Sequence, residues 1–165
     1  MNSSKDDTGS LHLLGAGPLP REPGSPDRAM LEAFPNRFPG RPYIIRIVFP
    51  EYTSLCPVTG QPDFGTIYVE YIPDRLCVES KSFKLYMFAW RNERAFMESI
   101  TNAILDDLCG AIAPLWCQVK GIFVPRGGTQ IQVFAEEFKE TDPLARQKAE
   151  RAAASWKLAQ NRYPG

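Results

Sequence analysis

The chain of 165 residues is long enough for one domain with a substantial hydrophobic core and too short for two ordinary domains. Its 19 basic and 19 acidic residues give a net charge of zero, which disfavours non-specific binding to nucleic acids or to anionic membranes. No apolar run is long enough to cross a membrane, and the polar, acidic start lacks the features of a signal peptide, so we expect a cytoplasmic protein that contacts no membrane.

Residues 1–41 are rich in proline and glycine and keep neither the period of a strand nor that of a helix. We therefore expect a mobile extension in front of the folded domain. Residues 30–34 are the exception, because their apolar side chains offer a short anchor onto the domain.

The folded domain is expected to span residues 42–138 and to begin with two strands. Residues 43–49 are dense in β-branched and aromatic side chains, and residues 65–72 alternate between the two faces of a strand. We expect the two strands to pair antiparallel. The segment from Glu51 to Asp63, rich in turn-forming residues, would then form the loop at the end of the sheet.

The hydrophobic period then changes to that of helices, over about residues 82–92 and 95–112. Two further strands are predicted at residues 115–124 and 130–135, joined by the tight turn Pro125-Arg126-Gly127-Gly128. The order ββααββ describes an α+β domain in which two helices cover one face of a four-stranded antiparallel sheet.

The remaining residues, 139–165, are expected to form a helical extension. Asp142 and Pro143 suit the N-cap and the first position of a helix that continues to about residue 160. Because a sheet with an uncovered face and two open edges tends to be completed by other subunits, we expect a homo-oligomer.

Cysteine and histidine are too sparse for the common metal sites. The only histidine is His12, and no Cys-x-x-Cys pair occurs among the four cysteines, Cys56, Cys77, Cys109 and Cys117. We therefore predict no metal site, and no disulfide in a reducing cytosol.

The 51–63 loop stands out because it holds both a thiol, Cys56, and a carboxylate, Asp63. A nucleophile and a proton carrier on one firmly held loop are one interpretation. A buried cysteine beside a turn aspartate is the other.

Four segments, taken together, resemble one enzyme family. They are residues 54–64 (Ser-Leu-Cys-Pro-Val-Thr-Gly-Gln-Pro-Asp-Phe), residues 78–86 (Val-Glu-Ser-Lys-Ser-Phe-Lys-Leu-Tyr), Arg91-Asn92 with Phe96 and Glu98, and the 125–128 turn. In this order and spacing they look like the short (type I) form of 7-cyano-7-deazaguanine reductase, the nitrile reductase QueF, over about residues 42–135. The resemblance implies a tunnelling fold related to GTP cyclohydrolase I. It also implies a multi-subunit barrel of two stacked pentamers, with active sites between neighbouring chains.

The activity implied by the resemblance is the NADPH-dependent, four-electron reduction of a nitrile to a primary amine, in the biosynthesis of the tRNA nucleoside queuosine. Cys56 matches the nucleophile that attacks the nitrile carbon and forms a covalent thioimide. Asp63 matches the general acid/base that takes the thiol proton and protonates the nitrile nitrogen.

The same resemblance implies a substrate pocket around two glutamates. Glu79 and Glu98 match positions that anchor a guanine-like edge, whose adjacent N–H groups suit a carboxylate. Val78 and Ser80 would line this pocket. A charge at a helix entry, for Glu79, and a solvated carboxylate, for Glu98, are the alternative interpretations.

Lys81, Ser82 and Lys84 belong to the segment that the family uses for NADPH, and Arg126 would add a phosphate contact. Without the resemblance, the two lysines are ordinary surface residues. No Gly-x-Gly-x-x-Gly motif follows a strand, so a Rossmann domain is not expected to hold the cofactor.

One departure from the family pattern concerns residue 97. Family members commonly carry a histidine just before the glutamate that is here Glu98, whereas this chain has Met97. Methionine cannot transfer a proton, so the second proton donor is open.

Two rival functions stay open at this stage. A non-enzymatic purine- or pterin-binding oligomeric module would use the same scaffold. An amidine-forming enzyme acting on nitrile-bearing tRNA would keep the thiol but would need no nicotinamide.

Overall fold

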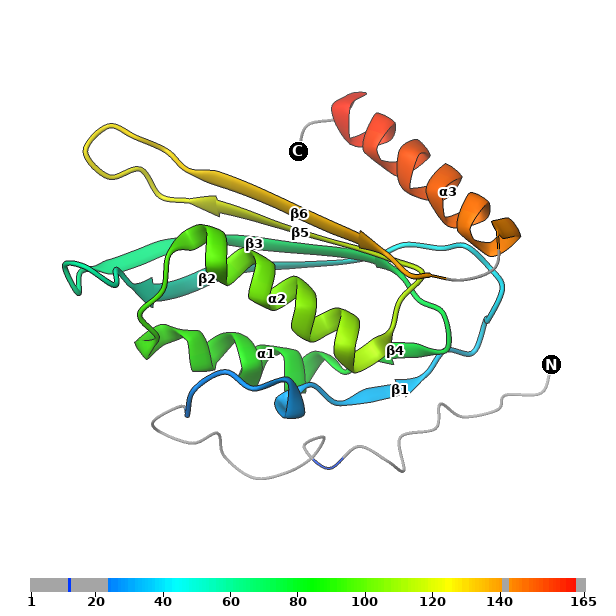
Figure 1. The fold of residues 1–165 in the computed structure, drawn as a ribbon, viewed down its shortest axis with the longest axis horizontal. Helices are drawn as coiled ribbons and strands as arrows, with labels where there is room; N and C mark the ends of the chain where they lie inside the picture. Colours follow the sequence, from blue (N-terminus) through cyan, green and yellow to red (C-terminus); the bar gives the residue numbers. More distant parts are fainter. Residues whose placement is uncertain (1–11, 13–23, 141–142, 163–165) are drawn as a thin grey trace.

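The computed structural model describes His12 and residues 24–140 and 143–162, which form an α+β fold (Figure 1). The main sheet has four antiparallel strands in the order β2-β3-β5-β6. These strands span Ile45–Leu55 (β2), Pro62–Ile72 (β3), Trp116–Phe123 (β5) and Gln132–Phe138 (β6). Between β3 and β5 the chain forms the helices Ser80–Ala89 (α1) and Met97–Ile112 (α2), with a 3-10 turn, Trp90–Asn92 (η2), between them. The predicted ββααββ order is confirmed, although β2 and β3 run further toward their connection than predicted.

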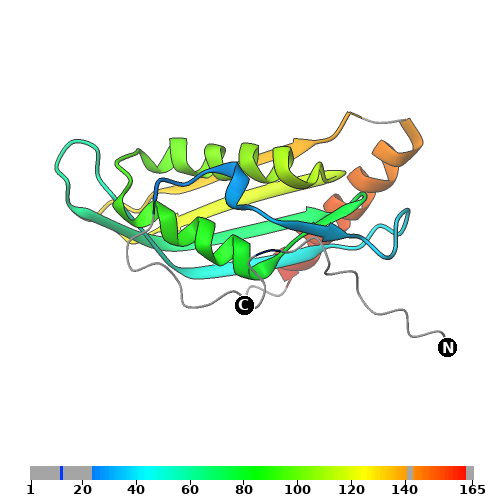
Figure 2. The ribbon, with the colours of Figure 1, turned by 90° about the horizontal axis from the view of Figure 1, so that it is seen from below.

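The main core fills the space between the sheet and the two helices, which cover one face of it (Figure 2). The apolar residues of α2 recur every three or four positions and therefore share one side of the helix. Ile100, Ile104 and Leu108 from this side are completely buried, in one cluster with the strand residues Ile67 and Val69.

A β-bulge interrupts the pairing of β2 with β3 at residues 50–51. Between the pairs Phe49–Ile67 and Tyr52–Gly65, β2 holds one more residue than β3. Because side chains alternate between the two faces of a strand, the extra residue reverses which residues of β2 point toward the helices: odd-numbered ones before the bulge and even-numbered ones after it. From Tyr52 onward it is the even-numbered residues of β2 that are buried under the helices.

A second, two-stranded sheet joins part of the predicted N-terminal extension to the domain. Ala33–Pro35 (β1) pairs antiparallel with Leu76–Val78 (β4), and this pairing satisfies backbone groups of both strands. Leu31 is buried in the main core, which confirms the apolar anchor predicted at residues 30–34. The contacts of residues 28–35 with the domain extend slightly beyond that predicted anchor at both ends. Residues 1–11 and 13–23 lie outside the described part of the chain.

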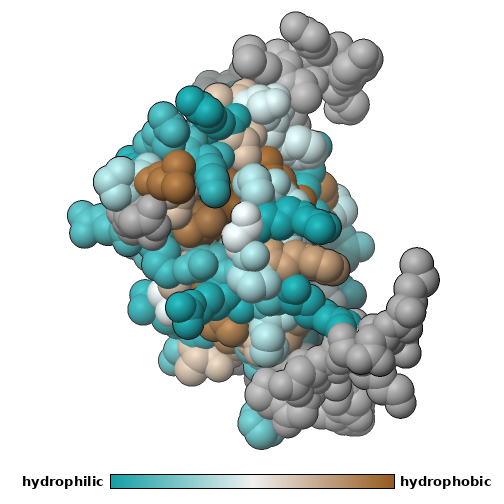
Figure 3. Space-filling view, turned by 90° about the vertical axis from the view of Figure 1, so that its right-hand side faces the viewer, coloured by the Kyte–Doolittle hydropathy of each residue, from teal (hydrophilic) through white to brown (hydrophobic). Residues whose placement is uncertain are grey.

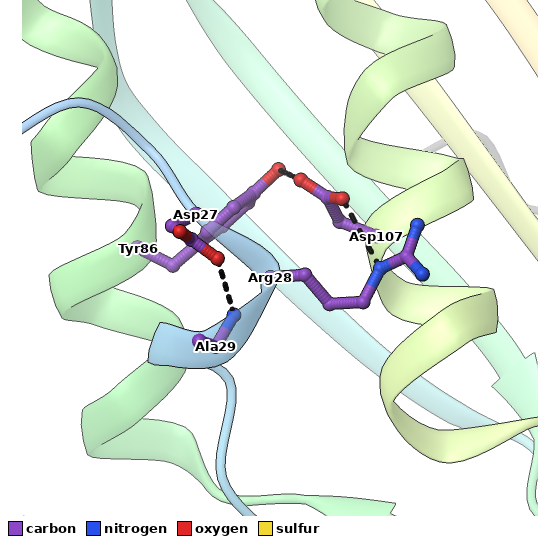
Figure 4. Close-up of polar contacts among 5 residues, drawn as sticks. All are labelled: Asp27, Arg28, Ala29, Tyr86 and Asp107. Carbon is purple, nitrogen blue, oxygen red and sulfur yellow. Dashed lines mark hydrogen bonds and ion pairs between the residues drawn. The ribbon is translucent and has the colours of Figure 1, made fainter.

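The segment ahead of β1 is fastened to both helices by a polar network (Figure 4). Asp27 caps the 3-10 turn Arg28–Met30 (η1) by accepting a hydrogen bond from the backbone two residues later. Arg28 Nε lies 3.4 Å from Asp107 Oδ1 on α2, and the other oxygen of Asp107 accepts a 2.8 Å hydrogen bond from the Tyr86 hydroxyl on α1. One carboxylate therefore ties three segments together.

The predicted last helix is present as Pro143–Arg162 (α3) and packs on the sheet face opposite α1 and α2, at one end. Trp116, completely buried there, donates a 3.0 Å hydrogen bond to Glu136, which also accepts one of 2.6 Å from Lys157 on α3. This end of the molecule presents apolar patches among hydrophilic residues (Figure 3), and Leu144 in the first turn of α3 is 59% exposed.

Beyond α3, no helix or strand of the described chain covers the outer face of the sheet, which is partly apolar. Val48, Phe64 and Phe134 point outward from β2, β3 and β6 and are each about half exposed. β2 and β6 form the two edges of this sheet. Among the described residues, no helix has both the length and the hydropathy needed to cross a membrane.

Candidate active site

Cys56 follows β2 directly and opens the connection 56–61 to β3. Its N–H donates a 2.8 Å hydrogen bond to the Gln61 carbonyl, and its own carbonyl accepts one of 2.9 Å from the N–H of Gly60. Gly60 has φ 70°, a left-handed conformation that glycine adopts without strain. The connection is therefore much shorter than the predicted loop of residues 51–63, because both strands continue into it.

The Cys56 side chain is mostly buried and lies among hydrogen-bond donors. The hydroxyl and N–H of Thr59, then the N–H of Val58 and the guanidinium of Arg126, stabilise the thiolate and lower the pKa of Cys56 from 9.0 to about 6. Partial burial acts in the opposite direction and does not prevail. At neutral pH the side chain is mainly the thiolate, which is the nucleophilic form.

Asp63 lies at the start of β3 with its side chain 4% exposed, and its Oδ1 is 3.1 Å from Arg126 Nε. Arg126 comes from the turn between β5 and β6, where it exchanges backbone hydrogen bonds of 3.1 and 3.0 Å with Thr129. A carboxylate this deeply buried needs a partner to offset its loss of hydration. The structure thus brings Arg126, predicted as a cofactor contact, to Cys56 and Asp63.

Two buried hydroxyls beside Asp63 were missed by sequence reasoning. Ser54 pairs with Asp63 across the two strands, and Tyr52 lies two residues earlier on the same face. Their hydroxyls face each other, yet neither they nor Asp63 Oδ1 makes a well-formed hydrogen bond within the described chain. Burial raises the pKa of Tyr52. Because unsatisfied buried polar groups are rare and concentrate at functional sites, this cluster marks the same place as the thiol.

Glu98 lies at the same end of the molecule, in the first turn of α2 (Figure 1). Two backbone hydrogen bonds join the chain just before α2 to Leu55, the residue before Cys56. The Leu55 N–H donates one of 2.9 Å to the Glu93 carbonyl, and the Leu55 carbonyl accepts one of 3.3 Å from the Ala95 N–H. The Glu98 side chain is exposed, where the helix dipole favours a carboxylate. It is therefore available to a ligand at this end.

Glu79 lies toward the other end. The strand from Asp63 to Ile72 is roughly 30 Å long at about 3.3 Å per residue. Only a turn and the short strand β4 separate Ile72 from Glu79, so Glu79 lies near the far end of β3 (Figure 1). Glu79 is the N-cap of α1, and its two oxygens accept hydrogen bonds of 2.8 and 2.7 Å from the N–H groups of Lys81 and Ser82. One chain therefore does not bring Glu79 and Cys56 into the same pocket.

The other residues predicted around Glu79 differ in exposure. Val78 is buried at the end of β4, and Ser80 is exposed, with its hydroxyl 3.4 Å from Glu79. Lys84 is exposed and Lys81 is half-buried in the first turns of α1. Ser82 is completely buried. Its hydroxyl donates a 2.8 Å hydrogen bond to the Glu79 carbonyl and accepts one of 3.0 Å from the N–H of Glu32. This position argues against a direct contact between Ser82 and a cofactor.

The remaining cysteines belong to the core. Burial raises the pKa of Cys77, and a hydrogen bond with Cys109 together with burial raises that of Cys117. Cys109 is partly buried against the main core. In the described chain all four cysteines are free, and no three metal-ligating side chains cluster.

A hollow of about 500 Å³ lies behind this site. Its lining includes the outward side chains of Thr53, Phe64, Thr66, Ile122 and Val124, which belong to the sheet face opposite the helices. Tyr52 reaches this hollow but Cys56 and Asp63 are not part of its lining, so we assign the chemistry to the thiol and its neighbours rather than to the hollow.

Comparison with known proteins places this geometry in a family. The model of the QueF-like protein family matches residues 62–142. The NADPH-dependent 7-cyano-7-deazaguanine reductase of Nitratidesulfovibrio vulgaris strain DP4 is 59% identical over 160 residues, 97% of this chain and 96% of the relative. That of Desulfovibrio desulfuricans is 62% identical over 155 residues, 93% of each chain. The chain belongs to the NADPH-dependent 7-cyano-7-deazaguanine reductase family.

The 7-cyano-7-deazaguanine reductase family extends to more distant relatives, such as that of Neisseria meningitidis serogroup C, which is 44% identical over 151 residues. The archaeosine synthase QueF-Like, solved in the apo form, has the same fold: its TM-score is 0.55, at 23% identity, covering 62% of this chain and 99% of that one. The predicted tunnelling fold is thereby confirmed.

Met97 occupies a structural position in this member of the reductase family. Its side chain is 8% exposed and lies in the main core cluster. Its carbonyl accepts a 2.9 Å hydrogen bond from the Thr101 hydroxyl one turn later. The side chain at position 97 therefore contributes packing rather than proton transfer.

Proposed function

We propose that this protein reduces 7-cyano-7-deazaguanine to 7-aminomethyl-7-deazaguanine with NADPH, in the pathway to queuosine. The observation that carries the proposal is a thiol of lowered pKa, Cys56, next to the buried Asp63–Arg126 pair, in a chain that matches named reductases over almost its whole length. The archaeosine synthase shares the fold at 23% identity, and that likeness extends to the fold alone.

In the first step, the Cys56 thiolate attacks the nitrile carbon. A carbon–sulfur bond forms, one π bond of the nitrile breaks, and the nitrogen takes up a proton that Asp63 would deliver. The result is a thioimide on Cys56; starting from the thiolate, the step takes up one proton and involves no oxidation or reduction. When bound, NADPH supplies hydride for the two reductions that follow. Each of the two reductions would also take up a proton, and the Cys56 sulfur would leave as the thiolate between them, which returns Cys56 to its starting state.

Recognition of the substrate requires, in this proposal, residues from two chains. Glu98 stands at the Cys56 end, where its exposed carboxylate can accept the N–H groups of a guanine-like edge. Glu79, with Val78 and Ser80, stands at the opposite end and would reach the thiol of a neighbouring subunit. The capping oxygens of Glu79 keep lone pairs for such contacts. A homo-oligomer, as in the two stacked pentamers that the family resemblance implies, would bring the ends together.

The half-exposed apolar residues of the outer sheet face and the open edges of β2 and β6 support assembly from several copies. A zero net charge supports the absence of direct nucleic-acid binding. A reactive thiol that has no disulfide partner suits a reducing compartment, which supports a cytoplasmic location.

The residues at the start of α1 fit the cofactor in part. Lys81 and Lys84 would hold its phosphates through their side chains. The backbone N–H groups of Lys81 and Ser82 already bond to Glu79, so they would not form the phosphate site that many helix N-termini offer.

The test is the loss of NADPH absorbance when 7-cyano-7-deazaguanine is added to reduced protein. The Cys56→Ala variant should lose at least about a thousandfold in rate, because no other group replaces the nucleophile. Cys109→Ala, which removes a partly exposed thiol outside the site, should keep activity. Absence of NADPH oxidation by folded, reduced wild-type protein would sink the proposal. Nitrile binding without a covalent adduct on Cys56 would favour a binding module.

A further inference from the structure

Three side chains in a row at the end of β2 point to the side of the sheet that the helices cover. Tyr52, Ser54 and Cys56 are buried, whereas the two residues between them are partly exposed. Because side chains two residues apart share one face of a strand, Ser54 lies between Tyr52 and the thiol. Asp63 stands directly opposite Ser54 on β3, and the Cβ atoms of such a pair are about 5 Å apart. Ser54 therefore adjoins both the nucleophile and the carboxylate.

The hydroxyls of Tyr52 and Ser54 are enclosed on this side of the sheet, with 1% and 0% of each residue exposed. Within the part of the chain that the structure describes, neither hydroxyl makes a well-formed hydrogen bond. The same holds for Asp63 Oδ1, although it forms an ion pair of 3.1 Å with Arg126 Nε. Hydroxyl groups can rotate about their C–O bonds, so neighbouring ones can satisfy each other and a carboxylate. Burial raises the pKa of Tyr52, so its hydroxyl keeps its proton and stays a donor.

We propose that Ser54 is a positioning residue for Asp63: its hydroxyl donates a hydrogen bond to the carboxyl group, and Tyr52 orients that hydroxyl by donating to its oxygen. The inference deepens the proposed function and rests on it, because Asp63 is the proton donor in the first step. The cross-strand pairing carries it, since it fixes the carboxyl group and the hydroxyl opposite each other in a closed space.

The hydrogen bond acts while the proton is transferred. The Cys56 sulfur bonds to the nitrile carbon, one π bond of the nitrile opens, and the carboxyl proton of Asp63 moves to the nitrogen. Ser54 and Tyr52 keep their own protons throughout. A hydrogen bond to a charged acceptor is roughly twice as strong as one to a neutral acceptor. The Ser54 hydroxyl therefore stabilises Asp63 more after the proton has left than before, which lowers the barrier to proton donation.

The experiment compares two reactions of Cys56 at pH 7 in the absence of NADPH. Thioimide formation with 7-cyano-7-deazaguanine needs the proton of Asp63, whereas alkylation by iodoacetamide needs none, because iodide leaves. Mass spectrometry of the quenched protein follows both reactions. In Ser54→Ala, thioimide formation at saturating nitrile should be at least about tenfold slower than in wild type, because a hydrogen bond to a charged group is lost. The alkylation rate and the nitrile concentration for half-maximal rate should stay unchanged.

Two further variants serve as controls. Ser54→Thr keeps the hydroxyl and a side chain suited to a strand, so it should restore most of the thioimide rate. Thr53→Val removes the neighbouring hydroxyl, which lies on the opposite face of β2, with little change of shape. It should match wild type in both reactions.

Equal thioimide rates in Ser54→Ala and wild type would overturn the role of Ser54 alone. Alkylation slowed as much as thioimide formation would also overturn it, because the loss would then lie in the thiol itself. If Ser54→Ala does not fold, judged by circular dichroism, the same two rates in Tyr52→Phe decide, since this variant keeps the ring that packs edge-on against Phe123. Wild-type protein that forms no adduct and oxidises no NADPH would contradict the proposed function, and the role of Ser54 with it.

Discussion

At the scale of single residues, what distinguishes Cys56 from the other thiols is the set of groups around it. Burial raises the pKa of Cys77, although hydrogen bonds with Tyr43 and Tyr71 act against it, and a hydrogen bond with Cys109 together with burial raises the pKa of Cys117. Cys56 is also nearly buried, but it receives hydrogen bonds from Thr59, from the backbone and from Arg126, and its pKa is lowered. At Cys56 the donors outweigh the effect of burial on the pKa, whereas at Cys77 burial prevails, and this difference suits the nucleophile that we propose.

A pH dependence of stability follows from this difference. The unfolded chain holds the thiol proton up to about pH 9, its ordinary pKa being 9.0, whereas the folded chain releases it above about pH 6. Raising the pH from 6 to 9 therefore favours the folded state, and below pH 6 the contribution is lost. We expect the free energy of unfolding of wild type, relative to Cys56→Ala, to increase over this interval and to stay constant below it. Urea titrations of both proteins, at a fixed protein concentration and with a reductant, measure this difference in the free energy of unfolding. If the difference did not change with pH, the lowered pKa of Cys56 would be contradicted.

At the scale of elements, two glycines show how closely the helices and strands approach one another. A Cβ on Gly121 of β5 would lie 2.6 Å from the Phe123 ring and 3.0 Å from the Thr101 hydroxyl, both in the closed core. A Cβ on Gly110 of α2 would lie 2.4 Å from the Arg28 guanidinium, which is at the end of an exposed side chain and can move aside.

Alanine at these two positions should therefore have opposite effects. Gly121→Ala is expected to lower the free energy of unfolding by about 1–3 kcal/mol, because the core must shift to admit the methyl group. Gly110→Ala should leave it unchanged or raise it by up to about 1 kcal/mol. The gain in helix propensity is about 1 kcal/mol and the exposed Arg28–Asp107 pair is worth less. Chemical denaturation of both variants measures the effects. Equal losses would show that Arg28 is held as rigidly as the core.

The elements that the sequence predicts well are those with a regular hydrophobic period. The apolar face of α2 and the alternation of β5 are visible in the sequence and give the fold. Strand β4 has three residues and pairs with β1, whose residues lie 41 to 45 positions earlier, so no local pattern marks either strand. The bulge in β2 is equally invisible, since it depends on the pairing with β3. For that reason the burial of Tyr52 and Ser54 beside Asp63 could not be predicted from the sequence, whereas Cys56 and Asp63 were proposed because they share one short loop.

At the scale of the whole molecule, the proposed substrate residues fall into two groups at opposite ends. Cys56, Asp63 and Glu98 lie where β2 joins β3, and Glu79 lies where β4 leads into α1 (Figure 1). If each active site combines both groups, it must take one from each of two neighbouring chains.

Co-expression of two inactive variants tests this arrangement. Cys56→Ala and Glu79→Gln should each have little activity alone. Mixed oligomers isolated through two different tags should recover about a quarter of the wild-type sites, because random pairing joins an intact thiol to an intact Glu79 in that proportion. As the matched control, Cys56→Ala with Asp63→Asn should recover nothing, since both changes affect the same end. Failure of the first pair to regain activity, in oligomers shown to be mixed, would contradict a shared site.

The bulge in β2 also limits how this sequence can change in length. A residue added to the 56–61 connection changes the groups around Cys56 but leaves the pairing of β2 and the faces of its side chains unchanged. A residue removed between Phe49 and Tyr52 would restore strict alternation and turn the later side chains of β2 to the other face, carrying Cys56 away from Asp63. The face of the sheet on which Cys56 lies is thus determined by whether the number of residues before it in β2 is odd or even, and no single substitution can change that.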